Sequence, residues 1–247
     1  MSDAIQAPAA PSGAAVVFGD RLALAEDFVS ILADTGVSHG LIGPREVPRL
    51  WDRHVLNCAV IEDAFPAGAR LVDVGSGAGL PGVALAMARP DLDVHLVEPM
   101  LRRTTWLTGV VEDLALANVT VHRGRAEEFA GRLVAPWVTA RAVARLDKLA
   151  GWCVPLLEPG GTLVAMKGRS AADELAEVRA ALDAMGLTTG VVSLHGGSVL
   201  DESVVTVDLM FASPAGHPSG GSRPGARARG ARPPATKARR GKTPRRR

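Results

Sequence analysis

The chain has 247 residues, of which 47% are hydrophobic and 22% are charged, so it can bury one substantial core with short appendages. Its two cysteines exclude a disulfide framework and a cysteine-rich zinc site. No apolar stretch approaches the length of a membrane span, and the N-terminus lacks the basic-then-apolar order of a signal peptide. We therefore expect a cytoplasmic protein without a membrane segment or a metal site.

The net charge of +2 conceals an uneven distribution along the chain. Residues 213–247 contain 11 of the 28 Lys and Arg residues and no Asp or Glu, which leaves 17 basic and 26 acidic residues in the rest. The body therefore carries about −9 and the C-terminal segment +11. Because Pro, Gly and Ala fill this segment, it has little apolar surface to bury, and we expect a disordered basic tail. Such a tail would attract the phosphates of RNA.

The N-terminal quarter of the chain predicts a disordered leader followed by helices. Residues 1–15 are rich in Ala and Pro and are expected to be disordered. From Phe18 to Asp34 apolar residues recur at helical spacing, and a second helical stretch extends from Pro44 to Ala64. We expect residues 16–66 to form an N-terminal helical cap.

Strand and helix patterns alternate through residues 67–212, which we expect to be one core domain. The expected strands are 71–74, 93–98, 119–123, 137–143, 162–167, 189–195 and 203–211, and the expected helices are 82–89, 101–116, 126–132, 146–157 and 171–185. This alternation predicts a doubly wound α/β fold whose seven-stranded, mostly parallel sheet is covered on both faces. The last two strands have no helix between them, so they are expected to close one edge as an antiparallel hairpin.

Residues 71–82, with the sequence LVDVGSGAGLPG, predict a strand that enters a glycine-rich turn and then a helix. Gly75, Gly77 and Gly79 permit backbone angles closed to other residues and the close approach of a ligand to the main chain. At the carboxyl end of a parallel strand such a loop is typical of a nucleotide-type binding site. The alternative is a glycine turn that binds nothing.

Two registers of this loop favour two different ligands. Counted from Gly77, it fits the dinucleotide pattern G-x-G-x-x-G, but Pro81 then stands where a phosphate needs a backbone N–H. Counted from Gly75, it has Asp73 two residues earlier, and this acid suits a cationic amino group and repels a pyrophosphate. Glu98 ends the next strand, where an acceptor for ribose hydroxyls is expected. We therefore favour S-adenosylmethionine, which carries an amino group, a sulfonium and no phosphate, over NAD.

Five further features follow the predicted strands or lie in the helices. The segment 123–128 is expected to face the adenine of a bound nucleotide, or else to be a helix start whose acids suit the helix dipole. Arg141 lies inside an otherwise apolar run, where a lone guanidinium is costly to bury, so we favour a catalytic or cofactor-binding role in the site over a structural ion pair. Lys167 is interpreted as a solvated strand-end lysine, with contact to a substrate as the less favoured alternative. Cys153 and His54 are interpreted as structural residues.

The chain lacks residues that some classes of methyltransferase require. The chain has no tyrosine, so it has no Asn-Pro-Pro-Tyr or Asp-Pro-Pro-Tyr segment of the kind that cradles an exocyclic amine. No cysteine is flanked as the nucleophile of a carbon-5 pyrimidine methylase would be. A methyl acceptor that needs neither a base nor covalent help is therefore favoured, such as a ring nitrogen with a free lone pair.

The segments 73–82, 125–129 and 139–142, with Pro159-Gly160-Gly161 and Lys167-Gly168, resemble the ribosomal RNA small subunit methyltransferase G family, also called glucose-inhibited division protein B. The resemblance covers residues 53–211. It implies a Rossmann-like, S-adenosylmethionine-dependent enzyme that methylates N7 of one guanine in 16S rRNA, with the small ribosomal subunit as its partner. By this resemblance Arg125 is a candidate substrate or active-site arginine, and the cofactor contacts are Gly75, Leu80, Ala126, Glu127 and Arg141.

The chain departs from this family at two places. Asn57-Cys58 stands where the family often has Asp-Ser, and Glu202-Ser203 stands where a basic residue commonly precedes the last strand. The second departure puts an RNA contact near the C-terminal strand in doubt. Two other functions remain open: methylation of a small molecule, and a non-catalytic RNA-binding or ribosome-assembly role. The intact Asp73, glycines and Glu98 argue against the second of these.

Overall fold

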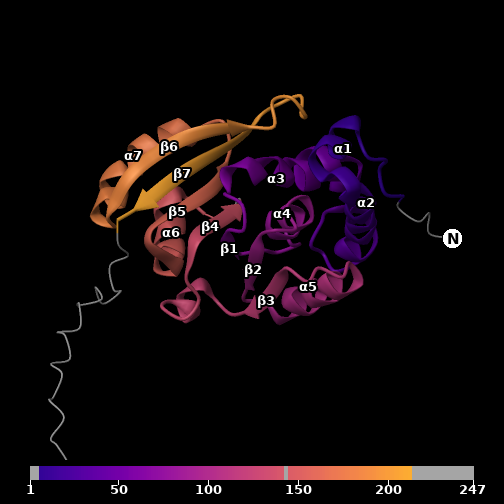
Figure 1. Cartoon of the computed structure of the whole chain (residues 1–247), viewed down its shortest axis with the longest axis horizontal. Coiled ribbons are helices and arrows are strands. Elements are labelled where there is room, and N and C mark those ends of the chain that lie inside the picture. Colours follow the sequence, from indigo (N-terminus) through magenta and orange to yellow (C-terminus); the bar gives the residue numbers. More distant parts are fainter. Residues whose placement is uncertain (1–5, 142–143, 213–247) are drawn as a thin grey trace, which may run out of the picture. The chain divides into compact units, whose positions relative to one another are not determined.

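The computed structural model describes residues 6–141 and 144–212, and the predicted basic tail lies outside the described residues. A seven-stranded sheet in the order β3-β2-β1-β4-β5-β7-β6 runs through this part of the chain (Figure 1). The strands are β1 (Arg70–Val74), β2 (Asp93–Glu98), β3 (Val119–Arg123), β4 (Ala135–Arg141), β5 (Leu157–Lys167), β6 (Leu187–His195) and β7 (Val204–Phe211). The predicted strand 137–143 therefore ends at Arg141 within the described residues.

Helices precede the sheet and connect its strands. The α-helices are α1 (Ser12–Phe18), α2 (Leu22–Ile31), α3 (Leu56–Ala59), α4 (Gly82–Ala88), α5 (Leu101–Asp113), α6 (Leu146–Cys153) and α7 (Ala171–Ala184). Short 3-10 or π turns are η1 (Gly19–Arg21), η2 (Leu32–Gly36), η3 (Pro44–Arg49), η4 (Leu50–Val55), η5 (Val60–Ala64), η6 (Ala126–Phe129) and η7 (Val154–Leu156). No helix in the described part of the chain is long and apolar enough to cross a membrane.

The strand directions confirm the predicted doubly wound sheet. Strands β1 to β5 pair in parallel, whereas β7 lies antiparallel to both β5 and β6. The final hairpin therefore closes one edge, with β6 outermost. From β1 the chain moves outward to β2 and β3 and then returns to the other side of β1 with β4. This reversal creates a crevice at the carboxyl ends of β1 and β4, where ligands bind in such sheets.

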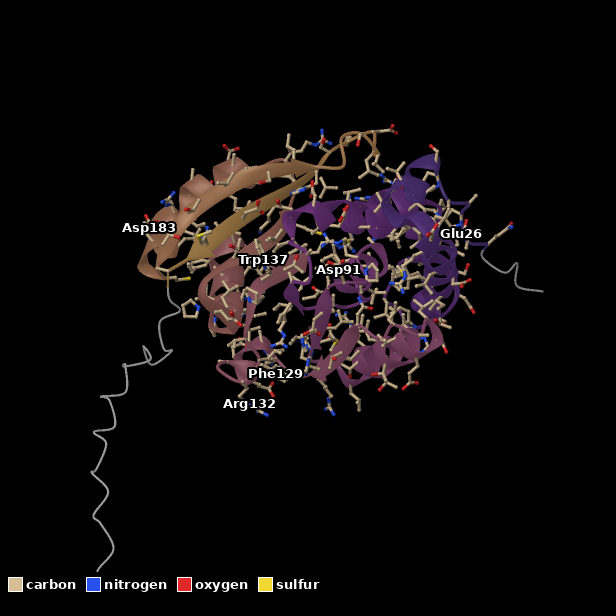
Figure 2. All side chains as sticks on the ribbon, viewed as in Figure 1. Glu26, Asp91, Phe129, Arg132, Trp137 and Asp183 are labelled. Atoms are coloured by element: carbon tan, nitrogen blue, oxygen red, sulfur yellow. The ribbon has the colours of Figure 1, made fainter. Side chains whose placement is uncertain are left out.

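Each face of the sheet packs its own hydrophobic core. Alternate residues of β1 divide between them, so that Leu71 packs with the N-terminal helices, α4 and α5, while Val72 packs with α6 and α7. Figure 1 shows α6 and α7 beside β5–β7, with α1–α5 toward the other end of the sheet. Trp137 of β4 lies near the middle of the fold (Figure 2), and Phe65 meets its ring edge-on with the centroids 5.7 Å apart.

The structure corrects the predicted boundary of the disordered leader. Helix α1 begins at Ser12, so the last four residues of the segment expected to be disordered are helical. Ala14 and Phe18 are buried in the core, and Trp51 Nε1 donates a hydrogen bond to the Pro8 carbonyl at 3.0 Å. Burial against η4 therefore outweighs a composition that favours disorder.

A second difference concerns the segment predicted as a helix over 146–157. Helix α6 ends at Cys153, because Pro155 has no N–H to continue it. Leu157 then already pairs with Ala135 of β4, so β5 begins five residues before the predicted start at 162.

Replacing Gly82 with Ala should destabilise the fold by about 1–3 kcal/mol, as expected for overpacking. A Cβ at this position would overlap the Leu96 side chain and lie 2.8 Å from Asp73 Oδ2. Gly151 in α6 is the matched control, because its Cβ would meet nothing within 4 Å. Gly151→Ala should stabilise the protein by about 0.5–1 kcal/mol. Urea unfolding of both variants measures the two effects, and equal destabilisation would contradict the packing described.

Candidate active site

The loop between β1 and α4 has the conformation that its glycines predict. Gly75, Gly77 and Gly79 have φ values of 76°, 55° and 81°, in the left-handed region that favours glycine. A Cβ on Gly79 would lie 2.6 Å from the Val83 side chain, so this glycine is needed for packing. A Cβ on Gly77 would meet only the Gly75 carbonyl, at 3.8 Å, so that face of the loop is open.

Two carboxylates hold this loop from inside the protein. Asp73 is fully buried, and its Oδ2 accepts a hydrogen bond from the Gly82 amide at 3.0 Å, at the start of α4. Glu98 is also buried; its Oε2 accepts from the Gly77 amide at 3.1 Å and its Oε1 from the Met100 amide at 2.9 Å. Asp73, the acid predicted to suit a cationic amino group, thus holds the start of α4 from inside the protein.

Most backbone amides of this loop donate hydrogen bonds to acceptors within the protein. The amides of residues 75 and 76 donate to the Val97 carbonyl, those of 79 and 80 to the Ser76 carbonyl, and that of Val83 to the Gly79 carbonyl. Together with Gly77 and Gly82, seven amides between 75 and 83 already have acceptors. A pyrophosphate is held at such a loop by free amides, so this one is poorly suited to a dinucleotide.

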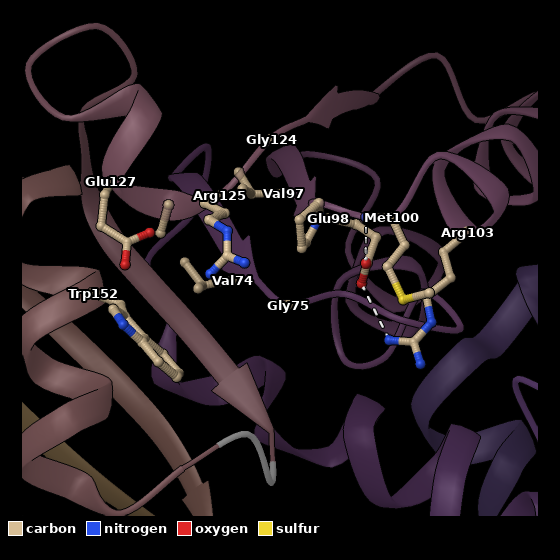
Figure 3. A pocket seen from close by; sticks show the side chains of 12 residues that line it. Val74, Gly75, Val97, Glu98, Met100, Arg103, Gly124, Arg125, Glu127 and Trp152 are labelled. Atoms are coloured by element: carbon tan, nitrogen blue, oxygen red, sulfur yellow. Dashed lines mark hydrogen bonds and ion pairs between the residues drawn. The ribbon is translucent and has the colours of Figure 1, made fainter.

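An apolar cavity of about 260 Å³ opens on one side of the loop (Figure 3). Glu98 and Arg103 stand at one end of it in Figure 3, and Glu127 and Trp152 at the other. Arg103 lies 3.6 Å from the Glu98 carboxylate. The other residues that line it are Val74, Gly75, Val97, Pro99, Met100, Gly124, Arg125 and Ala126. Flat apolar walls with an acid at one end suit the adenosine part of a nucleoside ligand.

A polar cavity of about 570 Å³ adjoins the apolar one, since Gly75 and Arg103 line both. The open face of Gly77 and the Leu80 side of the loop form one wall, and Arg141, from the end of β4, lines the cavity as well. The remaining residues that line it are Leu41, Ile42, Gly43, Glu46, Arg53, His54, Ser76 and Ala78. The N-terminal cap therefore contributes the outer wall of this cavity.

A groove of about 800 Å³ continues beyond the polar cavity, and Arg53 and Arg141 line both spaces. The groove runs past Arg49 and Arg169 toward the turn between β6 and β7.

The interpretation of Lys167 as a solvated lysine is wrong. Its side chain is 10% exposed, and Nζ binds the Ala144 carbonyl and the Glu174 carboxylate, each at 2.8 Å. This pairing ties the end of β5 to α7.

The structure thus distributes the predicted site residues over connected spaces. Glu98, Arg125, Ala126 and Glu127 line the apolar cavity; Gly77, Leu80 and Arg141 line the polar one; Gly75 lines both; Asp73 and Gly79 support the loop without lining either. The two candidate catalytic arginines are therefore not brought together. Arg125 belongs to the apolar cavity, and only Arg141 reaches the junction with the groove.

Several residues at these cavities were not identified from the sequence. Trp152 and Met100 line the apolar cavity, while Glu46 and His54 line the polar one. His54 was interpreted as structural, yet its ring contacts Arg141. The one mark of His54 in the sequence is its place in the helical stretch that precedes the glycine loop. No local pattern marks Trp152, whose place in the cavity depends on how α6 packs against the sheet.

The two thiols line none of the three spaces described above. Cys58 and Cys153 are fully buried, which confirms the interpretation of Cys153 as a core residue. Burial raises the pKa of Cys58 to about 11 and that of Cys153 higher still, so both stay protonated near neutral pH. Among the described residues, no three His, Cys, Asp or Glu side chains are grouped so as to hold a metal ion.

Comparison with known sequences identifies the family. A family model described as rRNA small subunit methyltransferase G (GidB) matches residues 21–199. The chain belongs to this family. The ribosomal RNA small subunit methyltransferase G of Streptomyces coelicolor is 51% identical over 245 residues, covering 98% of this chain and 100% of that protein. That of Thermobifida fusca is 54% identical over 198 residues, covering 80% and 84%. The resemblance found in the sequence motifs is confirmed.

Solved structures show the same fold at low sequence identity. A SAM-dependent methyltransferase from Aquifex aeolicus superposes with a TM-score of 0.51 and 19% identity, covering 70% of this chain and 98% of that one. TYW2 of M. jannaschii, solved in complex with AdoMet, gives a TM-score of 0.51 and 16% identity, covering 65% and 76%. The fold is thus that of Rossmann-like methyltransferases.

Replacing Asp73 with Asn should flatten part of the pH dependence of stability. Burial raises the pKa of Asp73 from 3.8 to about 7, against the opposing hydrogen bond from Gly82. Between about pH 4 and 7 the native state holds a proton that the unfolded state releases, so this group lowers the unfolding free energy as pH rises. The slope reaches at most about 1.4 kcal/mol per pH unit. Urea unfolding at pH 5, 6, 7 and 8 gives the unfolding free energy of the wild-type protein and of Asp73→Asn. If the two free energies change with pH in parallel, the raised pKa of Asp73 is contradicted.

Proposed function

We propose that this chain transfers the methyl group of S-adenosylmethionine to N7 of a guanine in 16S rRNA of the small ribosomal subunit. The observation that carries the cofactor assignment is the internal use of the loop amides by Asp73, Glu98 and backbone carbonyls. These internal hydrogen bonds leave no free amides to bind a pyrophosphate. S-adenosylmethionine contains no pyrophosphate and does not need such amides. Membership of the methyltransferase G family supports the reaction and the substrate.

The connected cavities fit the parts of this cofactor. The apolar cavity would take the adenine, and Glu98, which lines it, would accept hydrogen bonds from the ribose hydroxyls. A carboxylate has about four lone-pair positions, so two amide donors leave Glu98 capacity for them. The polar cavity beside Gly77 would take the methionine end. When bound, S-adenosylmethionine supplies an electrophilic methyl group on a positively charged sulfur.

The groove beyond the polar cavity is the place for the methyl acceptor. Guanine N7 is unprotonated at neutral pH and already nucleophilic, so the protein has mainly to align it. Positioning of two bound reactants supplies on the order of 7–11 kcal/mol of a barrier. The target base must leave its stack to enter, as bases of single-stranded loops do.

Arg141 is the residue we assign to the contact between protein and acceptor, since it lines both the polar cavity and the groove. Arginine commonly binds guanine through O6 and N7 together. Here N7 must stay free to attack, so Arg141 donates to O6 or to a neighbouring phosphate. Arg125 lines the apolar cavity, and we assign it to the cofactor end of the site.

An enzyme acting on ribosomal subunits works in the cytoplasm, where we place this chain. The acidic body would repel RNA at long range, while the eleven positive charges of residues 213–247 supply sequence-independent attraction to its phosphates. Those charges do not select the guanine, because phosphate contacts position a protein and base contacts specify.

Incubation with methyl-labelled S-adenosylmethionine tests the proposal. Naked 16S rRNA, 30S particles and a metabolite extract are offered in turn, and strand scission at N7-methylguanine locates the product. We expect label at one guanine of the RNA or the particle. Gly77→Val is the control: its side chain enters the open face of the loop and is strained at a φ of 55°, so both cofactor binding and labelling should be lost. Circular dichroism checks that this variant is still folded. Label confined to metabolites, or no label at all, would contradict the proposal.

A further inference from the structure

The N-terminal cap holds the guanidinium of Arg141 by two acceptors. Arg141 Nη1 donates to the Arg53 carbonyl at 3.1 Å, and Nη2 lies 3.3 Å from Nδ1 of His54. These bonds join positions 88 and 87 residues apart in the sequence. They occupy two of the five N–H donors of an arginine, so the group keeps donors for a ligand. The orientation of Arg141 therefore depends on η4.

The neighbours of His54 determine which ring nitrogen carries the proton. A guanidinium donates and never accepts, so Nδ1 of His54 accepts from Arg141 through its lone pair. Nε2 lies 2.9 Å from the Glu46 carboxylate, which accepts and does not donate when ionised. The two bonds are satisfied together only by a neutral ring with its proton on Nε2. Glu46 in η3 thus presents the Nδ1 lone pair to Arg141.

The charges around this ring favour its neutral form. The His54 side chain is 15% exposed, and burial is the largest cause that lowers its pKa below the usual 6.5. Arg141 and Arg53 act in the same direction, whereas the hydrogen bond to Glu46 opposes them. The charged or titratable groups that face this part of the polar cavity come from several elements: Glu46 from η3, Arg53 from η4, Arg103 from α5 and Arg141 from β4.

We infer that Glu46 and His54 are positioning residues that aim Arg141 at the methyl acceptor, with neutral His54 as the required acceptor of its hydrogen bond. This inference rests on the proposed function. A proton on Nδ1 would remove the acceptor and place a second positive charge 3.3 Å from the guanidinium. Methyl transfer should therefore decline on the acid side of neutrality, at a pH below the usual titration of histidine.

Two amide variants of His54 separate positioning of Arg141 from a packing role. In His54→Asn the amide oxygen takes the place of Nδ1 and still accepts from Arg141, whereas in His54→Gln the amide reaches the place of Nε2 and leaves Arg141 without that acceptor. Because a hydrogen bond to a charged group is lost, we expect kcat of the Gln variant to be about tenfold or more below that of the Asn variant. Neither amide titrates, so in both variants the pH profile of kcat should lack the decline at acid pH that we expect for the wild-type enzyme.

Glu46→Gln provides a second measurement. Its amide oxygen still accepts from Nε2, but the negative charge that raises the pKa of His54 is gone, so the acid limb should move to lower pH. A merely structural His54 would leave the limb where it is. Equal kcat in the Asn and Gln variants, or an acid limb that persists in the Asn variant, would overturn the inference.

Nitrogen-15 NMR of histidine-labelled protein keeps the inference testable apart from turnover. We expect the His54 signals at pH 7.5 to show a neutral ring protonated on Nε2. If the wild-type protein methylates no RNA, the proposed function fails. The NMR measurement of the His54 tautomer does not depend on that activity and still tests the positioning role. A charged ring at pH 7.5, or a proton on Nδ1, would overturn the positioning role even in an active enzyme.

Discussion

The constraint on which the site depends is the pair of carboxylates that hold the glycine loop from behind. Asp73 binds the first amide of α4, and Glu98 binds the amide of Gly77. One bond fixes where the helix begins and the other fixes the turn before it. The loop is therefore shaped by the protein itself and does not need a ligand's phosphate to order it.

This arrangement also separates two roles that an acid at a strand end can have. Asp73 is buried with its Oδ1 unpartnered, and burial holds its pKa near 7, so its contribution is to the shape of the loop. Glu98 supports the loop and at the same time lines the apolar cavity. Glu98 and Gly77 therefore line the cavities, whereas Asp73 is buried and lines neither of them.

The sequence predicted the parts of the fold that local patterns determine. Short apolar runs with clear flanking turns located β2 and β3 at their observed ends, and the absence of a helix before β7 indicated the closing hairpin. Features that depend on tertiary contact were missed: α1 is helical because Ala14 is buried, and Lys167 is paired because α7 brings Glu174 to it. No local pattern encodes either contact.

The residues of the candidate site also divide into those that local sequence patterns indicate and those that only tertiary packing brings to the cavities. The glycine loop, Glu98 and Arg141 were found because glycine spacing and a charge within an apolar run are visible in the sequence. Trp152 and the pair formed by Glu46 and His54 were not, since they reach the cavities only through the packing of α6 and of the cap. The spaces that a ligand would occupy are thus lined by a predictable loop and by walls that only the folded chain defines.

Calorimetric titration of the protein with S-adenosylmethionine and, separately, with NAD tests the central claim most directly. If the carboxylates occupy the amides that a pyrophosphate needs, S-adenosylmethionine should bind saturably at one site per chain and NAD should give no saturable heat at the same concentrations. NAD binding as tight as that of S-adenosylmethionine would contradict the description of the loop.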